Sequence, residues 1–167
     1  MSDLRVRPVT DADLPAICDI YNHYVRSSTV TFDEVESTLA EWEGKATRIA
    51  DAGIPFLVAE TQGGDLLGYA LGTPWSAKSA YRSTIENSIY LAPTAAGRGV
   101  GWALLAVFLD RCRDAGLRQV IAVIADRGAE ASIALHRKAG FIDAGRLTEV
   151  GEKFGDRLGV HFLQKTL

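Results

Sequence analysis

The sequence predicts a mixed α/β domain in which helices cover both faces of one sheet. Apolar residues recur at helical spacing in four segments, and short segments typical of strands separate them. Residues 119–125 are almost entirely apolar, as expected for a strand that is covered on both faces. With 167 residues, 47% of them hydrophobic and 23% charged, we expect a single domain over residues 1–167.

The predicted elements follow one another in the order β-α-α-β-β-β-α-β-α-β-β. Strands are predicted at residues 4–7, 55–60, 66–73, 84–91, 119–125, 141–149 and 157–167. Helices are predicted at residues 10–25, 37–52, 100–115 and 129–139. This order predicts a mixed sheet with helices on both faces.

Capping and turn residues support the first half of this assignment. Thr10 is a good N-cap, and acids follow it in the first turn, where they favour the positive end of the helix dipole. Gly53 is typical of a residue that ends a helix. Gly63 and Gly64 lie between the two strands of a hairpin, where a tight turn is needed.

The second half is supported by periodicity. The helix at residues 100–115 has a buried stripe that includes Leu104, Leu105 and Phe108, and Gly116 ends it. The helix at residues 129–139 ends at a glycine in the same way. Two strands then complete the chain, and we see no internal repeat, low-complexity segment or linker.

A glycine-rich turn joins the strand at residues 84–91 to the helix that follows it. Gly97, Gly99 and Gly101 alternate just before the helix, where free backbone N–H groups and the helix dipole suit a phosphate group. The turn matches neither a P-loop nor a dinucleotide-binding fingerprint. A tight turn without a ligand is the alternative interpretation.

Composition narrows the function classes. The net charge of −3 gives no reason to expect a basic surface for nucleic acid. The apolar run at residues 100–109 is shorter than the ~20 residues of a membrane-spanning helix, and no signal peptide is evident. Cys18 and Cys112 are expected to be buried free thiols, which fits a cytoplasmic protein. With three histidines and no HExxH pattern, we expect no metal site.

Four segments resemble a known family. They are Ile-Tyr-Asn at residues 20–22, YRSTIENSIY at 81–90, ASIALHRKAGF at 131–141 and VGEKFG at 150–155. In this order they resemble the GCN5-related N-acetyltransferases (GNAT), and within them the phosphinothricin and methionine sulfoximine N-acetyltransferase group. The resemblance implies a GNAT fold with a central, mixed, mostly antiparallel twisted sheet of about seven strands. It also implies acetyl-CoA as cofactor, a primary amine as acceptor, and a homodimer to which the final hairpin contributes.

The resemblance implies that the glycine turn wraps the pyrophosphate of CoA. The family pattern [QR]-x-x-G-x-[GA] begins here with Ala96, and Ala129 stands where relatives often carry Asn. We therefore expect weaker, but not abolished, binding of CoA. Backbone N–H groups around residues 89–91 are the expected oxyanion donors, because the family splays its sheet there. The expected cofactor-binding residues are Ile89, Tyr90, Leu91, Gly97, Arg98, Gly99, Val100, Gly101 and Ser132.

Two residues are candidates for catalysis. Glu86 is the expected general base, because a carboxylate in a mostly apolar strand is costly unless it is paired or functional. A solvated carboxylate is the alternative. His136 falls where many acetyltransferases place a Tyr that protonates the CoA sulfur, and the resembling subgroup carries His there. It either supports the leaving thiolate or is simply a packed, hydrogen-bonded side chain.

The candidate substrate residues surround the start of the same strand. The resemblance assigns Arg82 to the carboxylate of the acceptor, which a guanidinium can hold through two parallel hydrogen bonds. A surface arginine after a loop is the alternative. Aromatic residues are expected to wall the pocket, although they could equally be core. The expected substrate-binding residues are Phe32, Trp75, Tyr81, Arg82, Thr84, Lys153 and Phe154, the last two at the pocket mouth or at a dimer contact.

The sequence therefore predicts an acyltransferase that moves acetyl from acetyl-CoA to the α-amine of a small amino-acid-like substrate, by direct attack in a ternary complex. A single carboxylate base suits an α-amine of pKa ~7.7–8.0 better than a lysine amine of pKa ~10.4. Arg157 and Gly159 depart from the subgroup and leave the natural acceptor open. An acetyltransferase for another amine, such as a polyamine or a protein N-terminus, and a non-catalytic acyl-CoA sensor are the alternatives.

Overall fold

A computed structural model describes residues 4–167 of the chain. The strands are β1 Leu4–Pro8, β2 Phe56–Thr61, β3 Leu66–Pro74, β4 Thr84–Leu91, β5 Gln119–Ala125, β6 Ile142–Lys153 and β7 Asp156–Thr166. The helices are α1 Leu14–Ser27, α2 Leu39–Asp51, α3 Val100–Asp114 and α4 Glu130–Lys138, with short 3-10 turns η1 Asp11–Asp13, η2 Ser79–Tyr81 and η3 Pro93–Ala95. The predicted order of strands and α-helices is confirmed.

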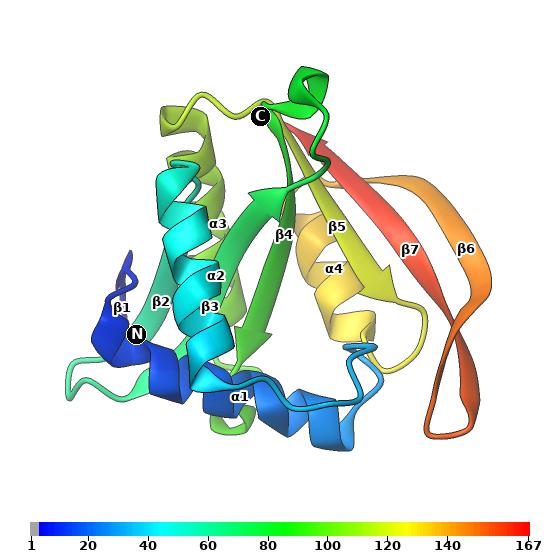
Figure 1. The fold of residues 1–167 in the computed structure, drawn as a ribbon, viewed down its shortest axis with the longest axis horizontal. Coiled ribbons are helices and arrows are strands. Elements are labelled where there is room, and N and C mark those ends of the chain that lie inside the picture. Colours follow the sequence, from blue (N-terminus) through cyan, green and yellow to red (C-terminus); the bar gives the residue numbers. More distant parts are fainter. Residues whose placement is uncertain (1–3) are drawn as a thin grey trace.

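The seven strands form one sheet in the order β1-β2-β3-β4-β5-β7-β6. Among the strand pairs of residues 4–167, β4–β5 alone is parallel, and all the other neighbours are antiparallel. Helices α1 and α2 cover one face of the sheet, and α3 and α4 cover the other (Figure 1). The predicted mixed, mostly antiparallel sheet with helices on both faces is confirmed.

Two apolar layers hold the helices against the sheet. On one face, Leu104, Leu105 and Phe108 of α3 are fully buried, as their helical spacing predicts. On the other face, Trp42 of α2 packs edge-on against Tyr69 of β3 at a centroid distance of 5.5 Å. The central strands are therefore covered from both sides.

The predicted boundaries differ most at the end of β6, which runs to Lys153 rather than to residue 149, and at the first helix. Thr10 does form a capping box with Asp13, but it caps the 3-10 turn η1, and α1 begins only at Leu14. Pro15 occupies the first turn of α1, where its missing N–H has no helical partner to lose. Arg7 clamps this corner, donating to both carboxylate oxygens of Asp13 at 2.8 Å and to Glu60 at 2.7 Å.

The sheet opens in its middle. Within residues 4–167, β4 and β5 pair only between Thr84–Glu86 and Gln119–Ile121, and beyond Glu86 the two strands separate (Figure 1). On the far side, β4 remains paired with β3 along its whole length. The second half of β4 therefore has one free edge, which faces the gap.

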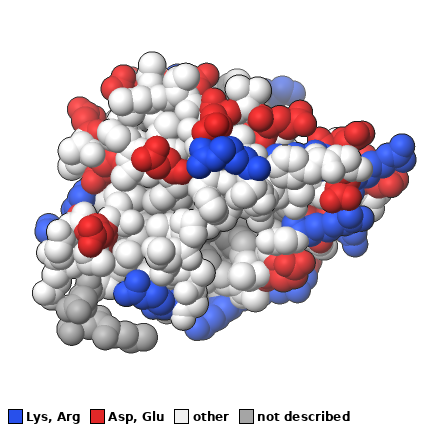
Figure 2. Space-filling model, turned by 90° about the horizontal axis from the view of Figure 1, so that it is seen from below, with Lys and Arg blue, Asp and Glu red and all other residues white. Residues whose placement is uncertain are grey.

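The surface carries both signs of charge. Figure 2 shows acidic and basic side chains intermingled on one face, around a middle that is largely uncharged. Over residues 4–167, no helix is long and apolar enough to cross a bilayer.

Candidate active site

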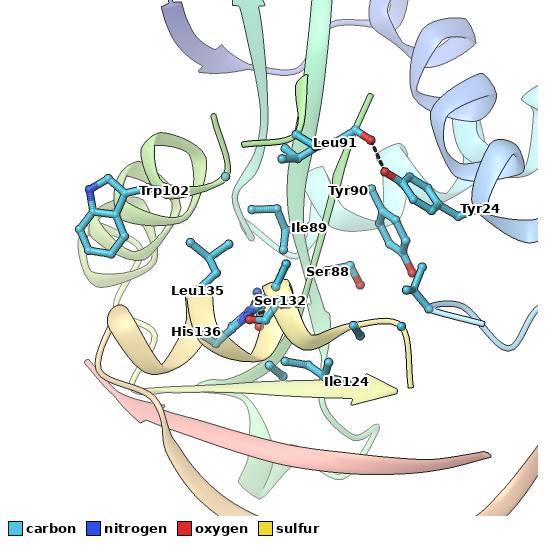
Figure 3. Close-up of a pocket in the computed structure, with 18 of the residues that line it drawn as sticks. Tyr24, Ser88, Ile89, Tyr90, Leu91, Trp102, Ile124, Ser132, Leu135 and His136 are labelled. Atoms are coloured by element: carbon cyan, nitrogen blue, oxygen red, sulfur yellow. Dashed lines mark hydrogen bonds between the residues drawn. The ribbon is translucent and has the colours of Figure 1, made fainter. Parts of the chain in front are cut away.

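A cavity of about 420 Å³ lies in the gap between β4 and β5, and we call it the gap cavity. It is lined by the second half of β4, the glycine loop, the start of α3, strand β5 and helix α4. Figure 3 shows Ile89 of β4 and Leu135 and His136 of α4 converging on it, with Trp102 of α3 at its rim. Its lining, which runs from the glycine loop to β5 and α4, places a bound ligand between the two strands.

The glycine loop forms one end of the gap cavity. Gly97 and Gly99 have φ angles of 72° and 79°, in the left-handed region that favours glycine. Gly99 caps α3 without a side-chain hydrogen bond, so the first amides of α3 remain available to a ligand. A Cβ atom at Gly101 would lie 3.2 Å from Leu135 Cδ2, so a small residue is needed where α3 meets α4. Uncapped amides at a helix start suit the diphosphate of a nucleotide-like cofactor.

The free edge of β4 presents backbone amides to the gap cavity. The amide of Ala92 donates to Leu67 O of β3 at 2.8 Å. Along β4, successive backbone amides point alternately toward β3 and away from it. The amides of Ile89 and Leu91 therefore point the other way, toward β5, where β4 has no pairing partner among the described residues. The carbonyl of Leu91 accepts a hydrogen bond from Tyr24 Oη at 2.6 Å (Figure 3). This edge can donate hydrogen bonds to an inserted thioester or to its oxyanion.

His136 lies buried at the base of the gap cavity, with both ring nitrogens engaged. Nδ1 lies 2.8 Å from the carbonyl of Ser132, which can only accept, so Nδ1 carries the proton. Nε2, 3.0 Å from Asn87 Nδ2, then accepts from that amide. Burial lowers the pKa of His136, and the ring packs edge-on against Phe141 at 4.8 Å. This arrangement favours a neutral, packed imidazole over a proton donor.

A second cavity of about 290 Å³ lies on the α1–α2 side of the sheet, and we call it the Glu86 cavity. Ser88 and Tyr90 line both cavities, so the two meet along β4. Burial raises the pKa of Glu86, and the nearby charge of Lys45 partly opposes this shift. Burial also raises the pKa of Tyr90 to about 12, so its hydroxyl stays protonated at neutral pH. A carboxylate of raised pKa beside a cofactor-sized cavity is suited to accept a proton.

The predicted cofactor residues mostly line the gap cavity. Those that do are Ile89, Tyr90, Leu91, Gly97, Gly99, Gly101 and Ser132. Arg98 is exposed on the glycine loop, and Val100 is buried in the core, so neither side chain lines the cavity. Ala96 and Ala129, where the family pattern is broken, line it with short side chains.

The predicted substrate residues are not all brought together. Phe32 lines the Glu86 cavity, whereas Tyr81 and Arg82 are exposed at η2 and line neither cavity of the described chain. The guanidinium of Arg82 donates to Ser79 O at 3.3 Å. Trp75 lies against the ring of Phe162, at a centroid distance of 6.4 Å.

The remaining three predicted substrate residues also lie outside both cavities. Thr84 is half-buried at the start of β4. Lys153 is buried, and its ammonium donates to the carbonyls of Ser28 and Thr31 at 2.7 and 2.9 Å, which ties β6 to the loop after α1. Phe154 is 62% exposed, so its ring faces solvent.

Several residues of the site were not predicted from the sequence. Trp42 and Lys45 line the Glu86 cavity, and Asn87 and Trp102 line the gap cavity. Trp42 and Lys45 are three residues apart and so share one face of α2, but that spacing is also typical of ordinary surface helices. Among residues 4–167, no three His, Cys, Asp or Glu side chains come together to hold a metal ion.

Comparison with known proteins agrees with this geometry. The family model described as "Acetyltransferase (GNAT) family" matches residues 17–141. A phosphinothricin N-acetyltransferase of Alcaligenes faecalis is 46% identical over 162 residues, which cover 97% of this chain and 82% of the relative. An L-methionine sulfoximine/L-methionine sulfone acetyltransferase of Pseudomonas paraeruginosa is 38% identical over 162 residues, covering 97% and 94%.

A solved structure is similar over the whole fold. It is the crystal structure of a GNAT superfamily phosphinothricin acetyltransferase from Sinorhizobium meliloti in complex with acetyl-CoA. The TM-score is 0.94 and the identity 38%, with 99% of this chain and 89% of that chain covered.

Proposed function

This chain belongs to the acetyltransferase (GNAT) family, and from that premise we propose that it transfers acetyl from acetyl-CoA to the α-amine of a small amino-acid-like acceptor. The relatives named for phosphinothricin and for methionine sulfoximine and sulfone indicate the acceptor class. The similar structure in complex with acetyl-CoA indicates the co-substrate.

The observation that carries the proposal is the meeting of two cavities along β4. The gap cavity offers backbone amides at Ile89 and Leu91, and the Glu86 cavity offers a half-buried carboxylate. A thioester held in the first can meet an amine held in the second across Ser88 and Tyr90, which line both. This arrangement fits direct attack in a ternary complex.

The chemistry divides between these groups. Glu86 takes a proton from the ammonium of the acceptor, directly or through water, which contributes roughly 10²–10⁴-fold to the rate. The free amine attacks the thioester carbonyl carbon, a C–N bond forms, and the C–S bond breaks. The amides of Ile89 and Leu91 stabilise the oxyanion. The attacking nitrogen loses its second proton as the amide forms, and the sulfur leaves as a thiolate that takes up one proton, so the products are the amide and the thiol.

The fit to CoA rests on the chain's own backbone. The uncapped start of α3 and the left-handed glycines 97 and 99 accommodate a diphosphate without any side chain. Arg98 is exposed on the same loop and adds a positive charge near it. The short side chains of Ala96 and Ala129 support the expectation of weaker CoA binding, because neither can donate a hydrogen bond.

His136 is better explained as a positioning residue than as an acid. Its Nε2 already accepts from Asn87, and burial disfavours its charged form. Its place in the reaction is then to hold Asn87 and the floor of the gap cavity. The carboxylate clamp assigned to Arg82 has no geometric support in this chain alone, because Arg82 lines neither cavity.

We also propose a cytoplasmic, single-domain homodimer. The buried free thiols of Cys18 and Cys112 fit a reducing compartment, and one continuous sheet fits a single domain. The exposed apolar residues of the final hairpin support a contact between copies: Ile142, Leu147, Val150 and Phe154. Sedimentation equilibrium tests the dimer, and a mass of one chain at micromolar concentration contradicts it.

Thiol release from acetyl-CoA with a panel of acceptors tests the function. We expect release with methionine sulfone, methionine sulfoximine or phosphinothricin. Release only with amines that lack a carboxylate supports a different acceptor class. Saturable binding of acetyl-CoA without release for any acceptor supports a non-catalytic sensor.

A further inference from the structure

One corner of the Glu86 cavity collects hydrogen-bond donors that have no acceptor among the described residues. Among residues 4–167, Trp42 Nε1 and Tyr69 Oη have no hydrogen-bond partner, and both atoms lie just beneath the cavity surface, since the two side chains are only 3% and 0% exposed. Lys45 Nζ lies 4.9 Å from the centroid of the Trp42 ring and forms no hydrogen bond or ion pair in residues 4–167. All three residues line the cavity, and we call them the donor corner.

The chemistry of the donor corner selects its ligand. A buried polar group without a partner is costly, and this corner offers an indole N–H, a phenol O–H and an ammonium. The complementary group is rich in oxygen acceptors and is favoured further if it is anionic. Burial lowers the pKa of Lys45, because a desolvated ammonium lacks the water that would otherwise balance its charge. A negative or strongly polar oxygen next to it replaces that water.

The sheet register separates Tyr69 of the donor corner from the base, whereas the ammonium of Lys45 lies near enough to Glu86 for their charges to interact. Tyr69 is paired with Tyr90, whereas Glu86 is paired with Thr73 at the other end of the same strand pair. These two positions are four residues apart on β4, roughly 13 Å at ~3.3 Å per residue. The α-carboxylate of an amino acid is attached to the same carbon as the amine and stays at the Glu86 end. The end of the side chain is the part that reaches the donor corner.

We propose that Lys45, together with Trp42 and Tyr69, binds the oxygen atoms at the side-chain end of the acceptor and so determines acceptor specificity. The chain then prefers amino acids whose side chains end in a sulfone, sulfoximine, phosphinate or similar oxygen-bearing group. Lys45 acts as a specificity-determining residue and takes no part in bond making. This inference rests on the proposed function and adds the residues that read the acceptor.

The test compares two acceptors that differ only at the side-chain end. Methionine sulfone and methionine share the α-amine, the α-carboxylate and the chain length, but only the sulfone carries side-chain oxygens. Wild type, Lys45→Met and Tyr69→Phe are assayed by thiol release at saturating acetyl-CoA. Arg48→Met is the matched control, since it removes the same charge from α2 and lines neither cavity.

We expect Lys45→Met to lower the preference for the sulfone over methionine by roughly 10–100-fold, the range of a lost charge-assisted hydrogen bond. The loss falls on KM for the sulfone, with kcat nearly unchanged. Tyr69→Phe gives a smaller loss in the same direction, because it removes only the hydroxyl and keeps the ring. Arg48→Met retains the wild-type preference.

Two results overturn the inference while the proposed function stands. The first is an equal loss for both acceptors in Lys45→Met, which indicates a contact with the shared carboxylate or a structural role. The second is an unchanged preference in both variants. If wild type acetylates no amino acid at all, the proposed function itself fails, and this inference fails with it.

Discussion

Replacing Glu86 with glutamine separates catalysis from folding at this site. Glu86→Gln keeps the size of the side chain and removes only its charge and its ability to accept a proton. The carboxylate lines the Glu86 cavity, and burial raises its pKa. The substitution therefore probes the proposed base without emptying space in the cavity.

The expected loss of activity follows from the role of a positioned base. We expect kcat/KM to fall by roughly 10²–10⁴-fold at neutral pH, with little change in the affinity for acetyl-CoA. Each tenfold loss corresponds to about 1.36 kcal/mol, so the transition state loses about 2.7–5.4 kcal/mol of stabilisation. In wild type, activity falls as the pH drops through the raised pKa of Glu86, because only the ionised form accepts a proton.

The free energy of unfolding is not expected to fall with the activity when Glu86 is replaced by glutamine. The folded pKa of Glu86 is raised, so the folded state binds more protons than the unfolded state between the ordinary and the raised pKa. Stability is therefore lost as the pH rises through this window, and it is highest when Glu86 is protonated. Glu86→Gln removes this penalty, and its melting temperature at pH 7 should equal or exceed that of wild type.

Two measurements together decide the matter: steady-state thiol release with methionine sulfone from pH 5 to 9, and thermal unfolding over the same range. Glu43→Gln on the exposed face of α2 is the control for loss of a carboxylate. Glu86 is not the base if Glu86→Gln keeps more than about a tenth of wild-type kcat/KM, because such a loss is too small for a positioned base. Its role as base is also refuted if activity and melting temperature fall together, because the residue would then be structural.

Three further predictions concern the loop, the hairpin and the buried histidine. Gly99→Ala places a Cβ on a residue with φ of 79°, so we expect a loss of about 1–2 kcal/mol in unfolding free energy. Calorimetry should also show weaker binding of acetyl-CoA, and an unchanged affinity would contradict a diphosphate site at this loop. Lys153→Met leaves the carbonyls of Ser28 and Thr31 without their donor, so chemical denaturation should show a loss of about 1.5–3 kcal/mol in unfolding free energy. Full stability together with lost activity would instead indicate that Lys153 contacts the substrate. His136→Ala should lower the melting temperature but leave the shape of the pH–rate profile unchanged, and the loss of one limb of that profile would restore His136 as an acid.

Local patterns in the sequence were sufficient for the elements and for part of the site. The limits of β4 and β5 follow from apolar residues at strand spacing, and α3 begins within the alternating glycines, directly after Gly99. The glycine turn and Glu86 are local signals as well, because a phosphate loop depends on backbone freedom and a carboxylate in an apolar strand is unusual by itself. The activity, acetyl transfer from acetyl-CoA to an amine, was predicted from the family resemblance and not from these local signals.

The tertiary structure alone decided which side chains share a cavity. Lys45 and Tyr69 are far apart in the sequence, and they meet because α2 packs across β3 at one register. His136 is engaged by Asn87 because α4 packs against β5, beside the free edge of β4, and Arg82 lies next to the turn η2, outside both cavities. Such meetings depend on strand register and helix packing, which arise from the sum of many distant contacts. A sequence read along its length determines the kinds of groups available, and the packed fold determines which of them face one another.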